Sequence, residues 1–342
     1  MEQGIVMKEW KLSSVILHIT DMCTSHCPCC YACANDVQYT HADINIIYKI
    51  IKELAKAKIE RVSLLGGDPV LHPYIVDIAK NLSENGIATG VMSNTMEFHE
   101  DFSEVVKYID VYETTIHGRN AIEHDTFSNK DGAYNLLMNN LRVLSKYDVT
   151  IGIAINIIPD TSDIIYEMVK NLLVKEKIRV GYLILQRIIP FGRAEDTTHY
   201  MLSKENLKKA LENVDKVHNE LGIKISVEDP FPLCAMDERY RKYMHPCEWG
   251  YTKAALNGKG DLTRCGADPR YLLGNIFEKS IEEIWRESPI LNDFREKKHL
   301  PDLCKKCKLL EACGGGCSLS CNTCGVDSTD YLMSFVPDQP IL

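Results

Sequence analysis

The sequence contains no run of apolar residues long enough to cross a membrane as a helix. Its first ten residues also lack the basic, apolar and small-residue succession of a secretory signal. Lys and Arg form no sustained stripe, and the formal net charge is −9 at pH 7, which argues against a nucleic-acid surface. We therefore expect a cytoplasmic protein that contacts neither membranes nor nucleic acids.

A framework of disulfides is also not expected, although the chain has 14 cysteines in 342 residues. Disulfide scaffolds are typically short secreted domains, whereas this length predicts about two domains and enough chain for a substantial core. The cysteines gather in groups with the short spacings of metal ligands. We predict bound metal in a reducing compartment.

The first group lies on residues 23–30, with the sequence CTSHCPCC. It follows residues 14–20, an apolar run that predicts a buried parallel strand, and α/β folds place their chemistry at the carboxyl ends of strands. A structural zinc ion takes four ligands, often as two Cys pairs, whereas each iron of a [4Fe-4S] cluster takes one terminal ligand. Three thiolates on this loop would leave one iron open. A zinc loop or a chance group of cysteines is the alternative.

This loop resembles the signature of the radical S-adenosylmethionine (SAM) enzymes. The resemblance implies that Cys23, Cys27 and Cys30 hold a [4Fe-4S] cluster and that the methionine portion of SAM chelates the open iron. The family commonly has an aromatic residue before the third ligand, near the adenine. Here Cys29 takes that place, and Tyr31 is the aromatic candidate for the SAM site. In the family, the reduced cluster cleaves SAM to a 5′-deoxyadenosyl radical that abstracts a hydrogen atom.

The chain after this loop alternates between apolar strands and amphipathic helices. Further strands are predicted at 61–65, 88–93, 111–116, 150–157 and 180–186. Helices are predicted at 42–58, 74–85, 102–108, 133–146, 164–176 and 204–221. About six βα units joined by right-handed crossovers predict an α/β fold, a partial (β/α)6 barrel of the radical SAM type.

The second predicted strand ends at Gly66-Gly67-Asp68-Pro69. Paired glycines let a ligand approach the backbone closely, and a carboxylate accepts hydrogen bonds from an ammonium group. The tetrapeptide resembles the family's Gly-Gly-Glu-Pro motif, which implies that it binds the amine of SAM. A plain strand-to-helix turn is the alternative. The other residues predicted to bind SAM lie at later strand ends and are Ser93, Asn94, Thr115, Asn156 and Arg187.

A second system of cysteines occupies the last third of the chain, and its order and spacing resemble the SPASM domain. That domain normally binds two auxiliary [4Fe-4S] clusters. The resemblance implies that Cys247, Cys265 and Cys317 hold the nearer one. It implies that the distal cluster is held by Cys304, Cys307, Cys313 and either Cys321 or Cys324. Structural zinc sites are the alternative.

The two resemblances divide the chain into a barrel domain at residues 1–228 and a SPASM domain with a C-terminal tail at 229–342. Residues 190–194, with the sequence PFGRA, resemble a segment that follows the sixth strand in members with an extra cluster domain. Cys234 lies where the two predicted domains meet, and three roles are open for it. It is the fourth ligand of the nearer cluster, a catalytic hydrogen-atom donor to a substrate radical, or an inert buried thiol.

The resemblance implies an enzyme that modifies a ribosomally synthesised peptide or protein, by a thioether or carbon–carbon crosslink or by epimerisation. A flavodoxin- or ferredoxin-type reductant is the expected electron donor. The alternative is maturation of a cofactor or tetrapyrrole, such as oxidative decarboxylation of a haem precursor. A third hypothesis is a non-enzymatic adaptor in which all the cysteines bind zinc.

Overall fold

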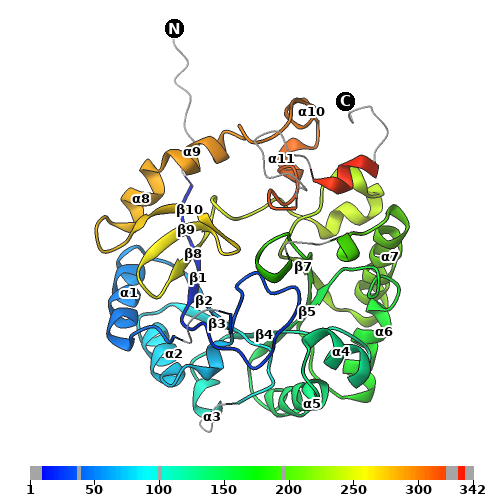
Figure 1. Cartoon of the computed structure of the whole chain (residues 1–342), viewed down its shortest axis with the longest axis horizontal. Coiled ribbons are helices and arrows are strands. Elements are labelled where there is room, and N and C mark those ends of the chain that lie inside the picture. The colour runs from blue at the N-terminus through cyan, green and yellow to red at the C-terminus, as the bar shows by residue number, and fades with distance from the viewer. Residues whose placement is uncertain (1–9, 37–39, 99–101, 195–197, 321–329, 336–342) are drawn as a thin grey trace.

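A single sheet of ten strands organises the protein, which a computed structural model describes at residues 10–36, 40–98, 102–194, 198–320 and 330–335. The strands follow the spatial order β10-β9-β8-β1-β2-β3-β4-β5-β6-β7. Neighbours from β8 through β7 are parallel, whereas β9 and β10 are antiparallel additions. Figure 1 shows the strands arranged around a ring with α1 to α7 outside it. The prediction of an α/β partial barrel is confirmed.

The strands are β1 (Ser14–His18), β2 (Arg61–Leu65), β3 (Ala88–Met92), β4 (Val111–Thr115), β5 (Thr150–Asn156), β6 (Tyr182–Gln186), β7 (Lys224–Val227), β8 (Lys253–Asn257), β9 (Asp261–Cys265) and β10 (Asp268–Asn275). The helices are α1 (Ile44–Lys56), α2 (Ile75–Glu84), α3 (Phe102–Val105), α4 (Ala121–Ser128), α5 (Ala133–Leu144), α6 (Ile165–Lys170), α7 (Lys204–Leu221), α8 (Ile281–Glu287), α9 (Pro289–Arg295), α10 (Asp302–Lys305) and α11 (Leu310–Cys313). Each strand and helix predicted from the alternation is present, with ends shifted by a few residues.

The alternation of side chains along β1 divides the core into two parts. Val15 and Leu17 are fully buried in the main cluster between the sheet and its helices. Ile16 belongs instead to a smaller cluster that includes Trp249, Cys265 and Cys317. Because successive side chains of a strand point to opposite faces, this inner cluster lies inside the ring. Two of the predicted auxiliary thiols therefore share the barrel interior.

The sheet continues past the predicted domain boundary at 228/229. β8 lies in the second predicted domain, yet it pairs in parallel with β1, with Ser14 opposite Lys253 and His18 opposite Asn257. β7 also adds a seventh parallel strand after the six that were predicted. The division into 1–228 and 229–342 stays a prediction, and both parts contribute to one sheet.

Helix α4 was not predicted, and its composition explains why. Its buried residues are His124 and Ser128, so it has no apolar stripe for a periodicity argument to detect. Its start is marked only by Asn120, whose side chain accepts a hydrogen bond from the backbone nitrogen of Glu123. In the part of the chain that the structure describes, no helix is both long and apolar enough to span a membrane.

Candidate active site and auxiliary thiol groups

The loop that follows β1 lies directly against the end of β2. The backbone nitrogen of Gly67 donates to the carbonyl oxygen of Thr20 at 2.7 Å, and that of Asp68 donates to Met22 at 2.6 Å. A Cβ added at Gly66 would stand 2.2 Å from the Thr20 oxygen, and one at Gly67 would stand 2.1 Å from the Met22 oxygen. The glycine pair is therefore needed for this close approach of two backbones. Contact of Gly66, Gly67 and Pro69 with SAM stays a prediction.

Asn35 closes the first half of the cysteine loop. Its side-chain oxygen accepts a hydrogen bond from the backbone nitrogen of Cys23 at 2.9 Å. Its amide nitrogen donates to the carbonyl oxygens of Cys23 at 2.8 Å and Ser25 at 3.1 Å. One side chain thus holds both ends of the turn that begins at the first predicted ligand.

Arg193 holds the second half of the loop, and it belongs to the segment 190–194 that the resemblance singled out. Its Nε donates to the carbonyl oxygen of Cys27 at 2.8 Å, and its Nη1 donates to Ala34 at 2.8 Å. The guanidinium also pairs with Asp36 at 2.6 Å. Its own backbone nitrogen donates to the carbonyl oxygen of Cys30 at 3.0 Å. The segment after β6 therefore fixes the backbone around two predicted cluster ligands.

The three predicted ligands of the SAM cluster face one another across this loop. Burial, followed by the charges of Cys23 and Cys30, raises the pKa of the Cys27 thiol to about 12. Burial also raises the pKa of Cys23, to which Asp68 and Cys30 contribute. Thiolates this close repel each other, so the site favours deprotonation only when a bound cation offsets their charge.

Asp68 and Ser93 meet behind the loop, where the ends of β2 and β3 adjoin. Asp68 is fully buried, and its carboxylate accepts hydrogen bonds from Ser93 Oγ at 3.1 Å and from the backbone nitrogen of Val70 at 3.3 Å. Burial raises the pKa of Asp68 to about 6. Asn94 lies on the other side, donating to Cys23 Sγ at 3.4 Å and to Thr24 Oγ1 at 3.0 Å. Three predicted SAM residues thus gather at Cys23, and their contact with SAM stays a prediction.

The remaining predicted SAM residues are spread over later strand ends. Thr115 and Asn156 close the adjacent strands β4 and β5. Arg187, which follows β6, has its guanidinium engaged by Asp330 in a buried ion pair. The structure gives Arg187 a partner within the chain, and a SAM contact for these three residues stays a prediction.

Tyr31 joins the cysteine loop to the barrel interior. It follows Cys30 directly and packs against the inner cluster that contains Cys265. Burial raises the pKa of its hydroxyl, and the charges of Cys30, Cys265, Glu228 and Asp229 raise it further. Its hydroxyl therefore lies among groups from both predicted metal sites.

The thiols predicted for the nearer cluster, Cys247, Cys265 and Cys317, pack together in the inner cluster. Burial raises the pKa of Cys265 to about 12, and Cys247 is among the charges that raise it further. Burial, Asp229 and Cys247 raise the pKa of Cys317. A carboxylate, Asp229, thus faces this group, and the backbone nitrogen of Arg187 donates to its Oδ2 at 3.2 Å.

The thiols predicted for the distal cluster lie on α10, α11 and the turn between them. Burial raises the pKa of Cys304 to about 11, and the charges of Cys313 and Cys307 add to this. The two candidates for the fourth ligand, Cys321 and Cys324, lie outside the described residues. Cys234 also faces this distal group, and burial, followed by the charges of Cys313, Cys304 and Cys307, raises its pKa.

The donor set of each group fits an iron–sulfur cluster because it consists of cysteine thiols, and cysteine thiolates are the ligands that hold such clusters. Within the described ranges, no three His, Cys, Asp or Glu side chains are arranged to hold a single metal ion. Two polar side chains that no motif identified lie at the nearer group. Asp229 faces the nearer group, and His18 lies beside the turn after Cys265.

His18 and Asp229 were missed because neither belongs to a recognised spacing. His18 ends β1 inside the barrel, and its Nε2 is buried without a hydrogen-bond partner among the described residues. Burial lowers its pKa to about 4. The available signal was positional, since His18 ends β1 and Asp229 lies two residues after β7, at strand ends where α/β folds place their sites.

Two family models match the chain. The radical SAM superfamily model covers residues 17–172, and the SPASM model, described as an iron-sulfur cluster-binding domain, covers residues 247–308. The chain belongs to the radical SAM superfamily. It is an enzyme that uses SAM and iron–sulfur clusters, and the zinc-binding adaptor of the third hypothesis is set aside. The matched segments include the cysteine loop and the start of the second cysteine system, so both predicted resemblances are confirmed.

Curated relatives align with most of this radical SAM enzyme at low identity. The AdoMet-dependent heme synthase of Methanosarcina barkeri is 22% identical over 283 residues, which is 78% of this chain and 79% of the relative. The PqqA peptide cyclase of Rhizobium meliloti is 22% identical over 318 residues, which is 89% of this chain and 81% of the relative.

Solved structures show the same fold. Streptococcus suis SuiB bound to its precursor peptide SuiA has a TM-score of 0.73 at 17% identity, with 90% of this chain and 72% of SuiB covered. A structure of anSMEcpe with bound AdoMet has a TM-score of 0.74 at 15% identity, with 95% and 91% covered. At these identities the likeness shows the fold alone.

Proposed function

We propose that this radical SAM enzyme modifies a ribosomally synthesised peptide or protein, by forming a thioether or carbon–carbon crosslink or by epimerising a residue. A relative named for peptide cyclisation aligns with most of both chains, and SuiB in complex with its precursor peptide shares the fold. We further propose that the chain carries two auxiliary clusters, one on each thiol group of the SPASM domain, and receives electrons from a flavodoxin- or ferredoxin-type protein.

The observation that carries the proposal is the position of Tyr31 between two thiol groups. Its neighbour Cys30 is a predicted SAM-cluster ligand, while its ring packs in the cluster of side chains that contains Cys265. A substrate inside the barrel at Tyr31 would therefore lie between the SAM loop and the nearer auxiliary thiols. This arrangement suits a reaction that removes a hydrogen atom and then an electron, as crosslink formation requires.

The chain's own residues fix and complete this arrangement. SAM, when bound at the reduced cluster, supplies the radical that takes one hydrogen atom from the peptide. Arg193 and Asn35 hold the loop that carries the three thiolates, so that the radical forms at a fixed place. Asp229, held by the backbone of Arg187 among the nearer thiols, is placed to accept the proton that oxidation of the substrate releases.

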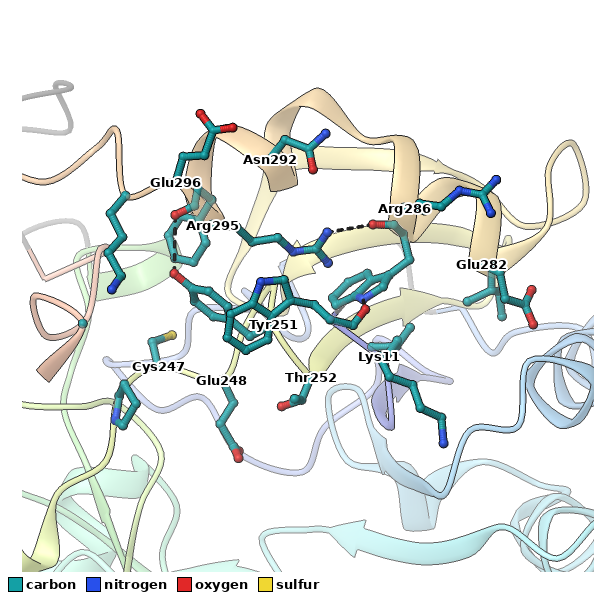
Figure 2. Close-up of a pocket in the computed structure, with 18 of the residues that line it drawn as sticks. Lys11, Cys247, Glu248, Tyr251, Thr252, Glu282, Arg286, Asn292, Arg295 and Glu296 are labelled. Carbon is teal, nitrogen blue, oxygen red and sulfur yellow. Dashed lines mark hydrogen bonds between the residues drawn. The ribbon is translucent and has the colours of Figure 1, made fainter. Parts of the chain in front are cut away.

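The described residues also form a cleft of about 1130 Å³ that reaches from Lys11 and Trp285 to Cys247. Figure 2 shows Arg295 in the middle of this cleft, donating to the carbonyl oxygen of Trp285, with Glu248 and other acids on the rim. Leu12 and Ile59 line it and precede β1 and β2, so the cleft lies at the amino ends of these strands, and no residue of the SAM loop lines it. We therefore do not place the substrate in this cleft.

Maturation of a tetrapyrrole is the second candidate, because two relatives from Methanosarcina barkeri are named for it. They are the AdoMet-dependent heme synthase and the Fe-coproporphyrin III synthase, the latter 22% identical over 334 residues. Both chemistries use a radical followed by loss of an electron, so the thiol geometry serves either. The distinction is the substrate.

The test uses full-length enzyme reconstituted without oxygen, SAM, a reductant and the short peptide encoded beside its gene, all in heavy water. Mass spectrometry of the peptide is the measurement. Loss of two hydrogens identifies a crosslink, and gain of one deuterium without other change identifies epimerisation. An unchanged peptide, together with decarboxylation of a parallel sample of Fe-coproporphyrin, would overturn the proposal in favour of the tetrapyrrole function.

A further inference from the structure

We propose that Cys234 is the fourth thiolate of the distal cluster, together with Cys304, Cys307 and Cys313. This assignment rests on the two-cluster part of the proposed function and not on the identity of the substrate. It departs from the pattern inferred from the sequence, in which Cys321 or Cys324 fills that place and Cys234 is a ligand of the nearer cluster, a hydrogen-atom donor or an inert thiol.

The backbone beside Cys234 is bonded to a distal thiol. Cys234 lies in a short 3-10 turn, η5 (Leu233–Ala235), and the backbone nitrogen of Leu233 donates to Cys313 Sγ at 3.3 Å. Hydrogen bonds of this kind to cluster sulfurs help set the reduction potential of a cluster. The residue next to Cys234 is thus already in contact with an atom that would bind iron.

Gly316, which follows α11, packs against Pro232, the residue before the same turn. A Cβ added at Gly316 would stand 3.1 Å from Pro232 Cδ and 3.2 Å from the Pro232 nitrogen. Gly316 has φ of 81°, a conformation that glycine adopts without strain. The hydrogen bond to Cys313 and the packing at Gly316 therefore both hold residues 232–234 close to residues 313–316.

The four thiols also interact through their charges. The thiol groups whose charges act on Cys234 are those of Cys313, Cys304 and Cys307. The thiol groups whose charges act on Cys304 are those of Cys313 and Cys307. The thiols of the nearer group interact with Asp229 and with one another instead. The cysteines thus form two separate groups, and Cys234 belongs to the distal one.

Four terminal thiolates complete a [4Fe-4S] cluster. The distal site then needs no ligand from residues 321–329, and Cys234 is not available as a hydrogen-atom donor. The nearer group keeps the three thiolates of Cys247, Cys265 and Cys317, with the carboxylate of Asp229 beside them. The distal cluster would therefore have four thiolate ligands, whereas the nearer cluster would have three.

The test compares Cys234→Ala, Cys234→Ser and Cys324→Ala in the full-length protein, reconstituted without oxygen. Iron and sulfide per chain are measured, and EPR spectra of the reduced protein are recorded with and without SAM. We expect Cys234→Ala, which leaves three thiolates at the distal site, to lose iron from that cluster and to change its EPR signal. Cys234→Ser, whose oxygen can still bind iron, should keep the iron with a shifted signal. Cys324→Ala should keep both the iron and the signal of the unsubstituted protein.

A matched control is Cys33→Ala, which removes a thiol of the SAM loop that the resemblance leaves without a ligand role. It should retain the full iron content. A SAM-dependent change in the EPR signal of each variant reports that its barrel is folded. The assignment is overturned if Cys234→Ala keeps all its iron, if Cys234→Ser has an unshifted spectrum, or if Cys324→Ala loses the distal signal. None of these outcomes depends on the peptide, so failure here is distinct from failure of the proposed function.

Discussion

Arg187 and Asp330 form a buried ion pair, with Nη2 2.9 Å from Oδ1 and side chains only 3% and 1% exposed. Arg187 follows β6, whereas Asp330 precedes the short turn η7 (Tyr331–Phe335) near the C-terminal end of the chain. The guanidinium also lies over the rings of Phe231 and Tyr331, at 4.9 and 5.6 Å from their centroids. The pair therefore joins the barrel to the segment that follows the auxiliary thiols.

Asp330→Ala should destabilise the protein by about 3–5 kcal/mol, because it leaves the guanidinium of Arg187 buried without its counter-charge. Chemical denaturation of anaerobically purified protein measures the change in the free energy of unfolding. Glu60→Ala is the matched control, since Glu60 pairs with Lys11 at 2.8 Å on the exposed surface. Its cost should stay below about 1 kcal/mol. If both substitutions lowered the free energy of unfolding equally, the buried pair would stabilise the protein no more than the exposed pair does.

Gly67→Ala should prevent assembly of the SAM cluster, because the added Cβ would stand 2.1 Å from the carbonyl oxygen of Met22 and displace the cysteine loop. The iron content should fall by about four atoms per chain, and SAM cleavage should be lost. Gly86→Ala serves as control, since its Cβ would meet no atom within 4 Å. Its φ of 72° costs about 1 kcal/mol of stability and leaves the iron in place. A full iron content in Gly67→Ala would show that assembly of the SAM cluster does not require the close approach of Gly67 to Met22.

Arg193→Lys should weaken the SAM cluster specifically, because a lysine cannot donate at once to the carbonyl oxygens of Cys27 and Ala34. We expect faster loss of iron to a chelator and a smaller SAM-dependent change in the EPR spectrum. Arg179→Lys is the matched control. Arg179 also donates to backbone carbonyls, at Tyr147 and at Val149, but lies before β6 and away from the loop. An equal rate of iron loss in both variants would contradict the role of Arg193 in holding the cysteine loop.

Asp68→Asn should remove a pH-dependent part of the stability. Burial raises the pKa of Asp68 from 3.8 to about 6. A carboxyl group whose pKa is raised on folding favours the folded state below its ordinary pKa, and this contribution is lost as the pH rises through about 6. Between pH 5 and 8 the unsubstituted protein should therefore lose about 1–2 kcal/mol that Asp68→Asn does not lose. Parallel pH curves from denaturant titrations of the two proteins would show that Asp68 is charged at pH 5.

Local patterns in the sequence were sufficient to predict the helices and strands that face solvent on one side. Helix α7 begins and ends at the predicted residues, Lys204 and Leu221, and Ser203 caps it by accepting from the backbone nitrogen of Asn206. The cysteine spacings likewise indicated both metal systems. These features depend on residues within one turn or one loop, so the sequence displays them directly.

Contacts between distant segments were not predictable in the same way. The pairing of β8 with β1 brings Lys253 beside Ser14, which no periodicity indicates. The ion pair of Arg187 with Asp330 also joins residues far apart in the chain, and so does the approach of Leu233 to Cys313. Spacing identifies the cysteines as ligands, but only the fold shows which thiols share a site.

The most direct test of the account follows a hydrogen atom. The substrate peptide is synthesised with deuterium at its carbon-bound positions and incubated with reconstituted enzyme, SAM and a reductant without oxygen. The account predicts 5′-deoxyadenosine that carries one deuterium, formed in step with the modified peptide. Unlabelled 5′-deoxyadenosine from this peptide, together with labelled product from a deuterated Fe-coproporphyrin, would contradict it.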